Sequence, residues 1–418
     1  MDLSVNTDLS EARGVVGSAL APVDVAAERA RTIGATYSHH LNSAGSALPT
    51  RTVVESVIRH LRQEEKEGGY EASAARKDDI EAVYVSAARL IGAEAEEIAL
   101  VDSATTGLRV IVDALRFGTG TRFLVNRSTY VSHALHLLSI CAETGAELHI
   151  VPSGEDGALD LRALEELLAV GRGSSDVLCV AHVPTSSGLV EPIAEIGALA
   201  RRYGALYLLD ATQSVGHLPV HVAEIGCDAL VTTGRKFLRA PRGTGFAYVR
   251  RSLLENLTPV APDVRGAVWN DVRHWELSAT ARRFETFESS VASRLGLGVA
   301  LDELLARGID ATAGYLIATA AALRDELANM SGVTVQDPAA CASGIVTFTV
   351  DGLSAEDANR RLAAMKVRTV SVPASHGQWD LGLRGVASVV RASVHVYNDS
   401  SDTRALLDAV GALAGGRA

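Results

Sequence analysis

Short apolar runs alternate with longer amphipathic stretches through the middle of this 418-residue chain, and this alternation limits the fold more than any other feature. The stretches between the runs, such as 106–118 and 191–204, carry apolar side chains at helical spacing. Strands that are apolar on both faces and separated by helices are typical of a mainly parallel sheet covered by helices on both sides. We therefore predict an α/β fold, with strands at 98–102, 122–126, 148–152, 176–183, 205–210 and 228–233.

Further apolar runs predict elements around this sheet. The segment 244–250 follows a loop rich in Gly, Pro and Arg with no helix in between, so we expect an antiparallel strand of the same sheet there. Later in the chain, Ala- and Leu-rich helices surround runs at 345–350 and 387–396, which indicates a smaller α+β domain. We predict three parts: an N-terminal arm (1–49), a large domain (50–300) and a small C-terminal domain (301–418).

The N-terminal arm carries little information of its own. Its first thirty or so residues are polar and acidic with weak apolar periodicity, which fits either a flexible arm or a short helix laid over another surface. We assign no function to them. After the arm, the pattern predicts a helix at 50–66, preceded by the helix-start residues Pro49 and Thr50 and ended by Gly68 and Gly69.

Composition and charge exclude several classes of protein. The chain has 39 Lys and Arg against 50 Asp and Glu, a net charge of −11, which argues against a protein that coats nucleic acid or an anionic membrane. Its four cysteines, at positions 141, 179, 227 and 341, form no C-x-x-C pair, so we expect no disulfide framework and no metal site. Neither a leader peptide nor a membrane span is visible. We expect a cytoplasmic protein that acts on a small molecule.

Polar side chains follow two of the predicted strands at the place where α/β sheets bind ligands, the carboxyl ends of the strands. Asp210 ends the run 205–210, and Lys236 follows the run 228–233, 26 residues later in the chain. Taken alone, the aspartate fits a helix N-cap and the lysine fits a solvated surface. Together they match the two groups that pyridoxal phosphate (PLP) requires: a lysine for the Schiff base and a carboxylate for the pyridinium nitrogen.

Two more patterns predict a site for a phosphate. Lys236 lies close to Arg235, Arg239 and Arg242 in an otherwise acidic chain, and this concentration of positive charge predicts a bound anion. The segment 102–107 joins a predicted strand to a predicted helix, where backbone N–H groups bind phosphate well. A plain Ser or Thr N-cap explains the same residues, and both interpretations can hold at once.

These motifs resemble the class V aminotransferase family, in the cysteine-desulfurase-like branch of the fold-type I PLP enzymes. The resemblance extends over 37–398 and is most specific at 232–246, TTGRKFLRAPRGTGF, which is similar to the family's cofactor-lysine motif. The segment 208–220, LLDATQSVGHLPV, precedes it at the expected interval. The resemblance implies fold type I, with a mainly parallel seven-stranded sheet in the large domain and a smaller α+β domain.

The resemblance also implies roles for individual residues at the cofactor. It implies that Lys236 bonds PLP, that Asp210 pairs with the ring nitrogen and that Gln213 contacts the ring hydroxyl. Tyr130 falls where the family stacks an aromatic side chain on the ring, and His133 is a rival for the same role. The phosphate contacts implied are Ser103, Ala104, Thr105, Thr233 and Arg235.

On the substrate side, the resemblance implies that Arg391 grips the α-carboxylate, a task that suits a bidentate guanidinium. Thr185 falls where many relatives carry an asparagine near the substrate. Candidate wall residues are Asn42, Ser43, Ala44 and Tyr70, and candidate specificity residues are His376, Gln378 and Trp379. For the loop residues His376, Gln378 and Trp379, an ordinary surface loop is an equally good explanation.

In this family a loop of a second subunit closes each site, which implies a homodimer with composite sites. The segment 282–290 occupies the corresponding place in this chain. Either Glu288 or Ser289 would supply the contact to the partner's phosphate, and the sequence leaves the choice open.

In a desulfurase, a loop before the carboxylate-binding arginine carries a nucleophilic cysteine. The corresponding loop of this chain, 367–386, contains no cysteine, which disfavours transfer of sulfur to the enzyme. The variants HLNSAG, GGYEA and PTSSG resemble the hercynylcysteine sulfoxide lyases and the PLP enzymes of lincosamide biosynthesis. That subgroup implies β-elimination at a cysteine S-conjugate in secondary or thiol metabolism. One of its members carries out decarboxylation-coupled oxidative deamination instead, and the sequence does not separate the two reactions.

Other activities on the same scaffold stay open. A desulfurase-like enzyme, an aminotransferase or an epimerase would keep every cofactor residue. A PLP-fold regulator without catalytic activity would normally carry a DNA-binding module, for which this chain has no spare segment. A nicotinamide dehydrogenase is disfavoured because no G-x-G-x-x-G follows the first predicted strand.

Overall fold

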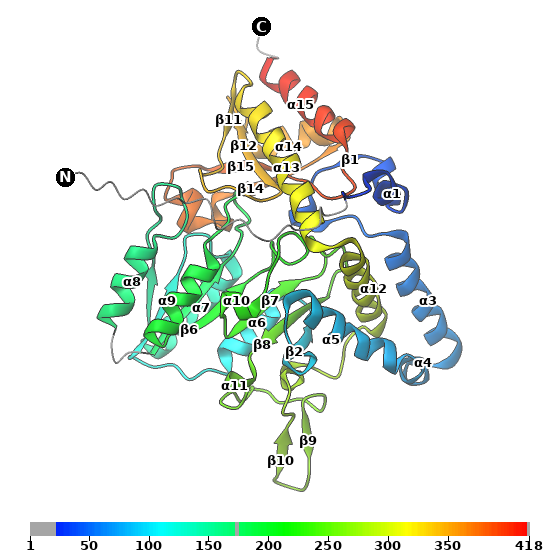
Figure 1. Ribbon diagram of the computed structural model, residues 1–418, viewed down its shortest axis with the longest axis vertical. Helices are drawn as coiled ribbons and strands as arrows, with labels where there is room; N and C mark the ends of the chain where they lie inside the picture. The colour runs from blue at the N-terminus through cyan, green and yellow to red at the C-terminus, as the bar shows by residue number, and fades with distance from the viewer. Residues whose placement is uncertain (1–21, 172–174, 416–418) are drawn as a thin grey trace, which may run out of the picture.

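The computed structural model describes residues 22–171 and 175–415. These residues form a seven-stranded and a four-stranded sheet with their helices, the larger sheet in the lower half of Figure 1 and the smaller one above it. The division of the chain at 49 and 300 stays a prediction, and residues 1–21 of the predicted arm lie outside the described residues.

The larger sheet has the strand order β2-β8-β7-β6-β5-β3-β4. The five strands from β3 to β7 pair in parallel, whereas β8 is antiparallel to both β7 and β2. This confirms the α/β fold, the mainly parallel sheet and the antiparallel strand expected at 244–250. The strands are β2 (Ile98–Val101), β3 (Thr121–Val125), β4 (Glu147–Ile150), β5 (Ser175–Ala181), β6 (Leu206–Asp210), β7 (Ala229–Thr233) and β8 (Gly245–Val249).

Helices bury both faces of this sheet. Successive side chains of a strand point to opposite faces, so Leu209 and Leu230 enter one core while Leu208 and Val231 enter another. The core of Leu208 is covered by α6 (Ala104–Asp113) and α7 (Val131–Thr144). The core of Leu209 is covered by α5 (Lys77–Ile91), α8 (Leu161–Val170), α9 (Ile193–Tyr203), α10 (Val222–Ile225) and α12 (Val291–Arg307).

The smaller sheet is antiparallel, with the order β11-β12-β15-β14. β12 (Ile345–Val350) has the predicted bounds, but β15 (Ser388–Ser393) begins one residue later than predicted and ends before 396. β11 (Val333–Val335) and β14 (Val370–Pro373) were not predicted, because edge strands this short show no distinct apolar run. The helices of this part are α13 (Ile309–Ala328), α14 (Ala355–Ala364) and α15 (Ser400–Gly415).

The residues before α3 run between the two sheets. α1 (Val25–Ala30) is a short helix laid over other elements, one of the two forms expected for the arm. β1 (His39–His40) pairs in parallel with β13 (Val367–Arg368), and α2 (Ser43–Ser46) follows it. α3 (Arg51–Glu67) then begins after the N-cap Thr50, which confirms the helix predicted at 50–66.

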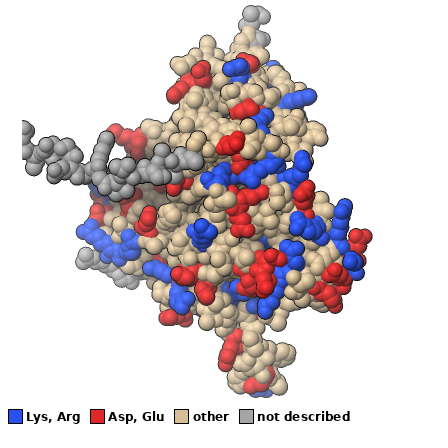
Figure 2. All heavy atoms as spheres, turned by 45° about the vertical axis from the view of Figure 1, so that its right-hand side comes forward, with Lys and Arg blue, Asp and Glu red and all other residues tan. Residues whose placement is uncertain are grey.

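The hairpin outside the two larger sheets was not predicted. A hairpin of β9 (Ala267–Trp269) and β10 (Trp275–Leu277) protrudes from the rest of the chain, with Trp269 and Val272 exposed (Figures 1 and 2). Figure 2 shows Lys and Arg interspersed with Asp and Glu over one face of the molecule. Among the described residues, no helix is both long and apolar enough to span a bilayer.

Gly216 tests the packing beneath the turn after β7. Its φ is 86°, and a Cβ there would lie 2.8 Å from the backbone carbonyl of Phe237. We expect Gly216→Ala to lower the free energy of unfolding by about 2 kcal/mol, through backbone strain and this contact. The matched change Gly411→Ala lies on α15 with open space around it, and should raise stability by about 0.5–1 kcal/mol. Urea unfolding measures both, and equal midpoints for the two variants would contradict the expectation.

Candidate active site

A cavity of about 260 Å³ opens at the carboxyl edge of the larger sheet. Residues that follow β2, β3, β5, β6 and β7 line it, which is the usual ligand position in α/β sheets. The structure brings together the residues predicted at the cofactor, and Thr185, predicted beside the substrate, lies with them: Ser103, Ala104, Thr105, Tyr130, Thr185, Asp210, Gln213, Thr233, Arg235 and Lys236.

Lys236 lies in the turn after β7, where the two sheets meet. Only 8% of the residue is exposed. The next residue, Phe237, belongs to the core of the smaller sheet and stacks on His217, with ring centroids 4.0 Å apart, and on His395, at 5.9 Å. The turn that carries the lysine is therefore packed into both parts of the molecule.

The environment of Lys236 disfavours a charged amine. Burial, reinforced by the positive charges of Arg235 and Arg391, lowers the pKa of Lys236 to about 7, although Asp210 opposes the change. A large fraction of the amine is therefore uncharged at neutral pH, which is the state that attacks an aldehyde.

Asp210 is the last residue of β6, and its carboxylate is ionised. Oδ1 accepts a hydrogen bond from the N–H of Thr212 at 3.0 Å, and Oδ2 lies 3.2 Å from Nδ1 of His133. Burial alone raises the pKa of Asp210, but His133 and Thr212 outweigh it, so the pKa is lowered. Tyr130, the N-cap of α7, lies edge-on to His133, with its ring centroid 6.0 Å from Nζ of Lys236.

The opposite end of the cavity is the N-terminus of α6. Ser103 caps this helix, because its Oγ accepts a hydrogen bond from the N–H of Thr106 at 3.1 Å. Oγ1 of Thr233 accepts one from the N–H of Ala104 at 2.9 Å. The N-cap interpretation is therefore correct for Ser103, which also lines the cavity.

These residues fit PLP. Arg235 and Arg242 line the cavity together with the residues of the α6 N-terminus, an arrangement suited to a phosphate. Among the described residues, Oγ1 of Thr212 and Oε1 of Gln213 are buried with no hydrogen-bond partner. Buried polar atoms normally have partners, so a polar molecule in this cavity would satisfy atoms that the chain leaves unpaired.

Arg391, on β15, brings the predicted substrate residues together. Its Nη1 donates to Oγ1 of Thr185 at 2.5 Å and to the backbone oxygen of Thr185 at 3.0 Å, and Nη2 donates to Oδ1 of Asn42 at 3.4 Å. The backbone oxygen of Ala44 accepts a hydrogen bond from Nε2 of Gln213 at 3.1 Å. Burial, together with a neighbouring guanidinium, lowers the pKa of Arg391 to about 10, so this group is charged at neutral pH.

Apart from Thr185, none of the predicted substrate residues lines this cavity itself. Arg391 and Ala44 bond the lining residues Thr185 and Gln213, and Asn42 bonds Arg391, whereas Tyr70 and His376 lie elsewhere. Tyr70, on α4 (Gly69–Ala75), is 78% exposed, because α3 carries α4 away from the edge of the sheet (Figure 1). It lines a second cavity of about 530 Å³ together with Glu288 and Ser289. His376 is exposed on the loop 374–387. The roles assigned to these residues stay predictions.

Several residues around the cavity were not predicted from the sequence. Each of these lies within three residues of a strand or of a residue predicted at the cofactor, and that position is the signal that could have found it. The loop 374–387 is also tethered to the site, because Oγ of Ser186 donates to Oδ2 of Asp380 at 2.8 Å. The additional lining residues are Asp102, Ser128, His133, Ala181, Val183, Thr212, Arg242 and Gly243, of which Asp102, His133, Thr212, Arg242 and Gly243 lie in motifs or were named above.

The four cysteines, all within the described residues, lie away from this cavity. Cys179 and Cys227 are buried, and burial raises the pKa of each thiol to about 12. Cys141 and Cys341 are half-buried, and burial raises their pKa values as well. Thiols with raised pKa values are poor nucleophiles.

Comparisons with known proteins agree with this geometry. The family model described as aminotransferase class-V matches residues 39–406. A probable cysteine desulfurase of Methanothermobacter thermautotrophicus is 26% identical over 394 residues, which cover 92% of this chain and 97% of the relative.

Solved structures share the fold. An apo cysteine desulfurase from Thermococcus onnurineus NA1 superposes with a TM-score of 0.84 at 23% identity, over 93% of this chain and 97% of that one. A cystine C–S lyase in complex with its reaction product, cysteine persulfide, superposes with a TM-score of 0.82 at 20% identity, over 91% of this chain and 99% of that one.

The lowered pKa of Lys236 predicts a pH-dependent cost of folding in protein freed of cofactor. The pKa of Lys236 is about 7 in the folded chain against an ordinary 10.5. Between these two pH values the amine is uncharged in the folded state and still protonated in the unfolded state. The cost is therefore full below pH 7 and is relieved as pH rises toward 10.5. We expect Lys236→Met to raise the melting temperature most below pH 7 and progressively less above it. A difference from wild type that stays constant with pH would contradict this.

Proposed function

This chain belongs to the aminotransferase class-V family of PLP enzymes, and from that premise we propose that it is a lyase that cleaves the C–S bond of a cysteine S-conjugate by β-elimination. The observation that carries the proposal is the position of the cysteines, none of which lines the cavity. Because no cysteine thiol lines the cavity to take sulfur from the substrate, the sulfur leaves together with its substituent as a free thiol.

Lys236 and Asp210 would perform the central steps. When bound, PLP withdraws electrons from the α-carbon of an amino-acid substrate. The uncharged amine of Lys236 bonds the cofactor and, once displaced by the substrate amine, accepts the α-proton at Nζ. The ionised carboxylate of Asp210 keeps the ring nitrogen protonated, and His133 in turn holds that carboxylate at 3.2 Å. Tyr130, whose ring centroid lies 6.0 Å from Nζ of Lys236, would supply an aromatic face for the ring, a role for which His133 is the alternative.

The elimination consumes no reactant other than the S-conjugate and water. The α-proton moves to Nζ of Lys236, and the electron pair of the broken C–S bond leaves with the sulfur, which takes up a proton as a thiol. Water then converts the three-carbon fragment into pyruvate and ammonium. The proposed phosphate contacts are Ser103, Ala104, Thr105, Thr233 and Arg235, all of which line the cavity.

The substrate would be oriented through its α-carboxylate. Arg391 is charged and is already bonded to Thr185 and Asn42, and its Nε is buried with no hydrogen-bond partner among the described residues. A carboxylate that accepts from this guanidinium would satisfy that atom. The tethered loop 374–387 is the candidate cover for the S-substituent.

We also propose a homodimer that acts in the cytoplasm. The residues offered to the partner's phosphate, Glu288 and Ser289, lie with Tyr70 at the second cavity, outside their own chain's site. The four free cysteines suit a reducing compartment. Light scattering of the intact protein tests the dimer, and a monomeric mass would refute it.

Desulfuration of cysteine is the competing reaction, since the relatives named above include cysteine desulfurases. It is less well supported because transfer to an enzyme thiol needs a reactive cysteine beside the substrate. Oxidative decarboxylation of a similar S-conjugate has no observation here that favours it over elimination.

The first experiment is to load the protein with PLP and add S-alkyl and S-aryl cysteines. We expect a visible absorbance band that Lys236→Met lacks, and equal amounts of pyruvate, ammonium and free thiol. A variant with all four cysteines replaced by serine should keep this activity. Alanine and sulfide formed from cysteine, and lost in the four-serine variant, would establish desulfuration instead. Carbon dioxide and peroxide without pyruvate would establish oxidative decarboxylation.

The role of Arg391 is tested separately. Arg391→Lys keeps the charge but loses the planar fork. Loss of hydrogen bonds to a charged group costs about 1.5–3 kcal/mol, so we expect kcat/KM to fall about 10- to 100-fold, mainly through KM. An unchanged KM would place the carboxylate site elsewhere.

A further inference from the structure

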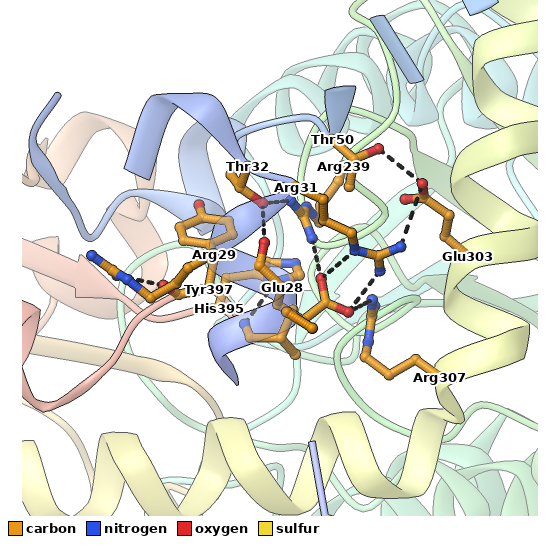
Figure 3. A network of polar contacts seen from close by, with 12 residues as sticks. Glu28, Arg29, Arg31, Thr32, Thr50, Arg239, Glu303, Arg307, His395 and Tyr397 are labelled. Atoms are coloured by element: carbon orange, nitrogen blue, oxygen red, sulfur yellow. Dashed lines mark hydrogen bonds and ion pairs between the residues drawn. The ribbon is translucent and has the colours of Figure 1, made fainter. Parts of the chain in front are cut away.

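We propose that the buried ion pair of Glu28 and Arg239 is a positioning device for Lys236, which holds the turn carrying the lysine against α1 and against the segment that follows the predicted wall residues 42–44. The proposal rests on the cofactor role proposed for Lys236. Figure 3 shows the pair in its network. The sequence grouped Arg239 with the arginines of an anion site. Arg239 does pair with an anion, but that anion is the Glu28 carboxylate on α1.

Arg239 closes the turn of Lys236. Its N–H donates to the backbone oxygen of Lys236 at 2.9 Å, and the N–H of Ala240 donates to the oxygen of Gly234 at 2.9 Å. The φ of Arg239 is 61°, a left-handed conformation that side-chain-bearing residues rarely adopt. Such a conformation persists only where surrounding contacts enforce it, so the side chain of Arg239 must be held firmly.

The side chain of Arg239 is held on all sides, and only 3% of the residue is exposed. Nη1 donates to Oε2 of Glu28 at 2.9 Å, Nε to the backbone oxygen of Leu48 at 2.8 Å, and Nη2 to Oγ1 of Thr32. The guanidinium carbon lies 5.1 Å from the ring centroid of Tyr397. A lysine carries all its N–H donors on one nitrogen and cannot reach the three separate acceptors that the nitrogens of Arg239 bond.

Glu28 is a suitable anchor because it stays ionised although it is buried. Burial raises the pKa of Glu28, but Arg31, Arg307 and Arg239 outweigh it, and the pKa is lowered. Arg31 bonds both carboxylate oxygens, at 3.0 and 2.6 Å, and Arg307 bonds Oε1 at 2.9 Å. Glu303 adds a second carboxylate, 3.5 Å from Arg31. Loss of one arginine therefore leaves Glu28 paired, whereas loss of Glu28 leaves the three guanidiniums with Glu303 as their one remaining carboxylate of this network.

The same arginine contacts the segment that follows the predicted wall residues 42–44. Leu48, whose carbonyl accepts from Arg239, follows α2, and the N–H of Ala47 donates to the backbone oxygen of Arg235 at 2.9 Å. The hydroxyl of Tyr397, beneath the guanidinium, lies 3.1 Å from Oγ of Ser43 and 3.2 Å from the N–H of Leu48. The side chain of Arg239 thus contacts the segment that follows α2, while its backbone closes the turn of Lys236.

Arg307 offers a matched control for this role. Like Arg239, it donates one hydrogen bond of 2.9 Å to Glu28. Its other side-chain partner is Oγ1 of Thr312, at 2.9 Å, and among the described residues it donates no hydrogen bond to the Lys236 turn or to Leu48. A variant of Arg307 therefore disturbs the ion network without releasing the lysine.

The experiment compares Arg239→Gln with Arg307→Gln, both loaded with PLP. We expect similar losses of thermal stability in the two variants. Only Arg239→Gln should move the pH midpoint of the Lys236-dependent absorbance band, upward by about half a pH unit or more, because a looser turn admits water to a cation that burial disfavours. It should also release PLP about tenfold faster. Arg239→Lys should restore stability more fully than it restores the midpoint.

Unchanged midpoint and release rate in Arg239→Gln would overturn the proposal, and so would equal changes in Arg307→Gln. If Arg239→Gln does not fold, Thr32→Val removes one contact of the guanidinium and should give a smaller upward change in the same midpoint, whose absence would overturn the proposal too. Failure of the proposed function is distinguishable, because a band that persists in Lys236→Met would deny Lys236 its cofactor role whatever Arg239 does.

Discussion

The parallel pairing of β3, β5, β6 and β7 is the constraint on which the rest of the molecule depends. It places the carboxyl ends of these strands at one edge, so that residues far apart in the sequence meet in one cavity. Burial disfavours the charged form of both Asp210 and Lys236, but the two groups end in different states. Asp210 keeps its charge because His133 and Thr212 outweigh burial, whereas Lys236 loses much of its charge because burial dominates and two guanidiniums reinforce it.

Arginine, rather than lysine, holds the parts of the chain together around this cavity. Backbone carbonyls of the wall would be unsatisfied in the interior without donors. Arg235 supplies one to Gly45 and Arg239 supplies one to Leu48. A planar group with several N–H bonds can serve a carbonyl and a carboxylate at the same time, so the wall is held with few side chains in a confined space.

Local signals explain what could be predicted from the sequence. The strands β6 and β7, the helix α3 and the cofactor residues after the strands were predicted because each rests on a short contiguous pattern. The hairpin of β9 and β10 and the short strand β11 carry no such pattern. Tyr70 was assigned to the pocket by motif position alone, and the length of α3 places it elsewhere. Glu28 and Arg239 lie 211 positions apart, and neither segment carries a sequence pattern that predicts their contact.

The position of α1 also bears on the order of events during synthesis. Arg29, on this helix, bonds Asp402 across 373 positions of the chain. At a synthesis rate of about 5–20 residues per second, the helix waits roughly 20–75 s on the ribosome before that partner exists. Glu28 of the same helix can pair with Arg239 and Arg307 earlier, so α1 gains its contacts in stages and its bond to the C-terminal helix comes last.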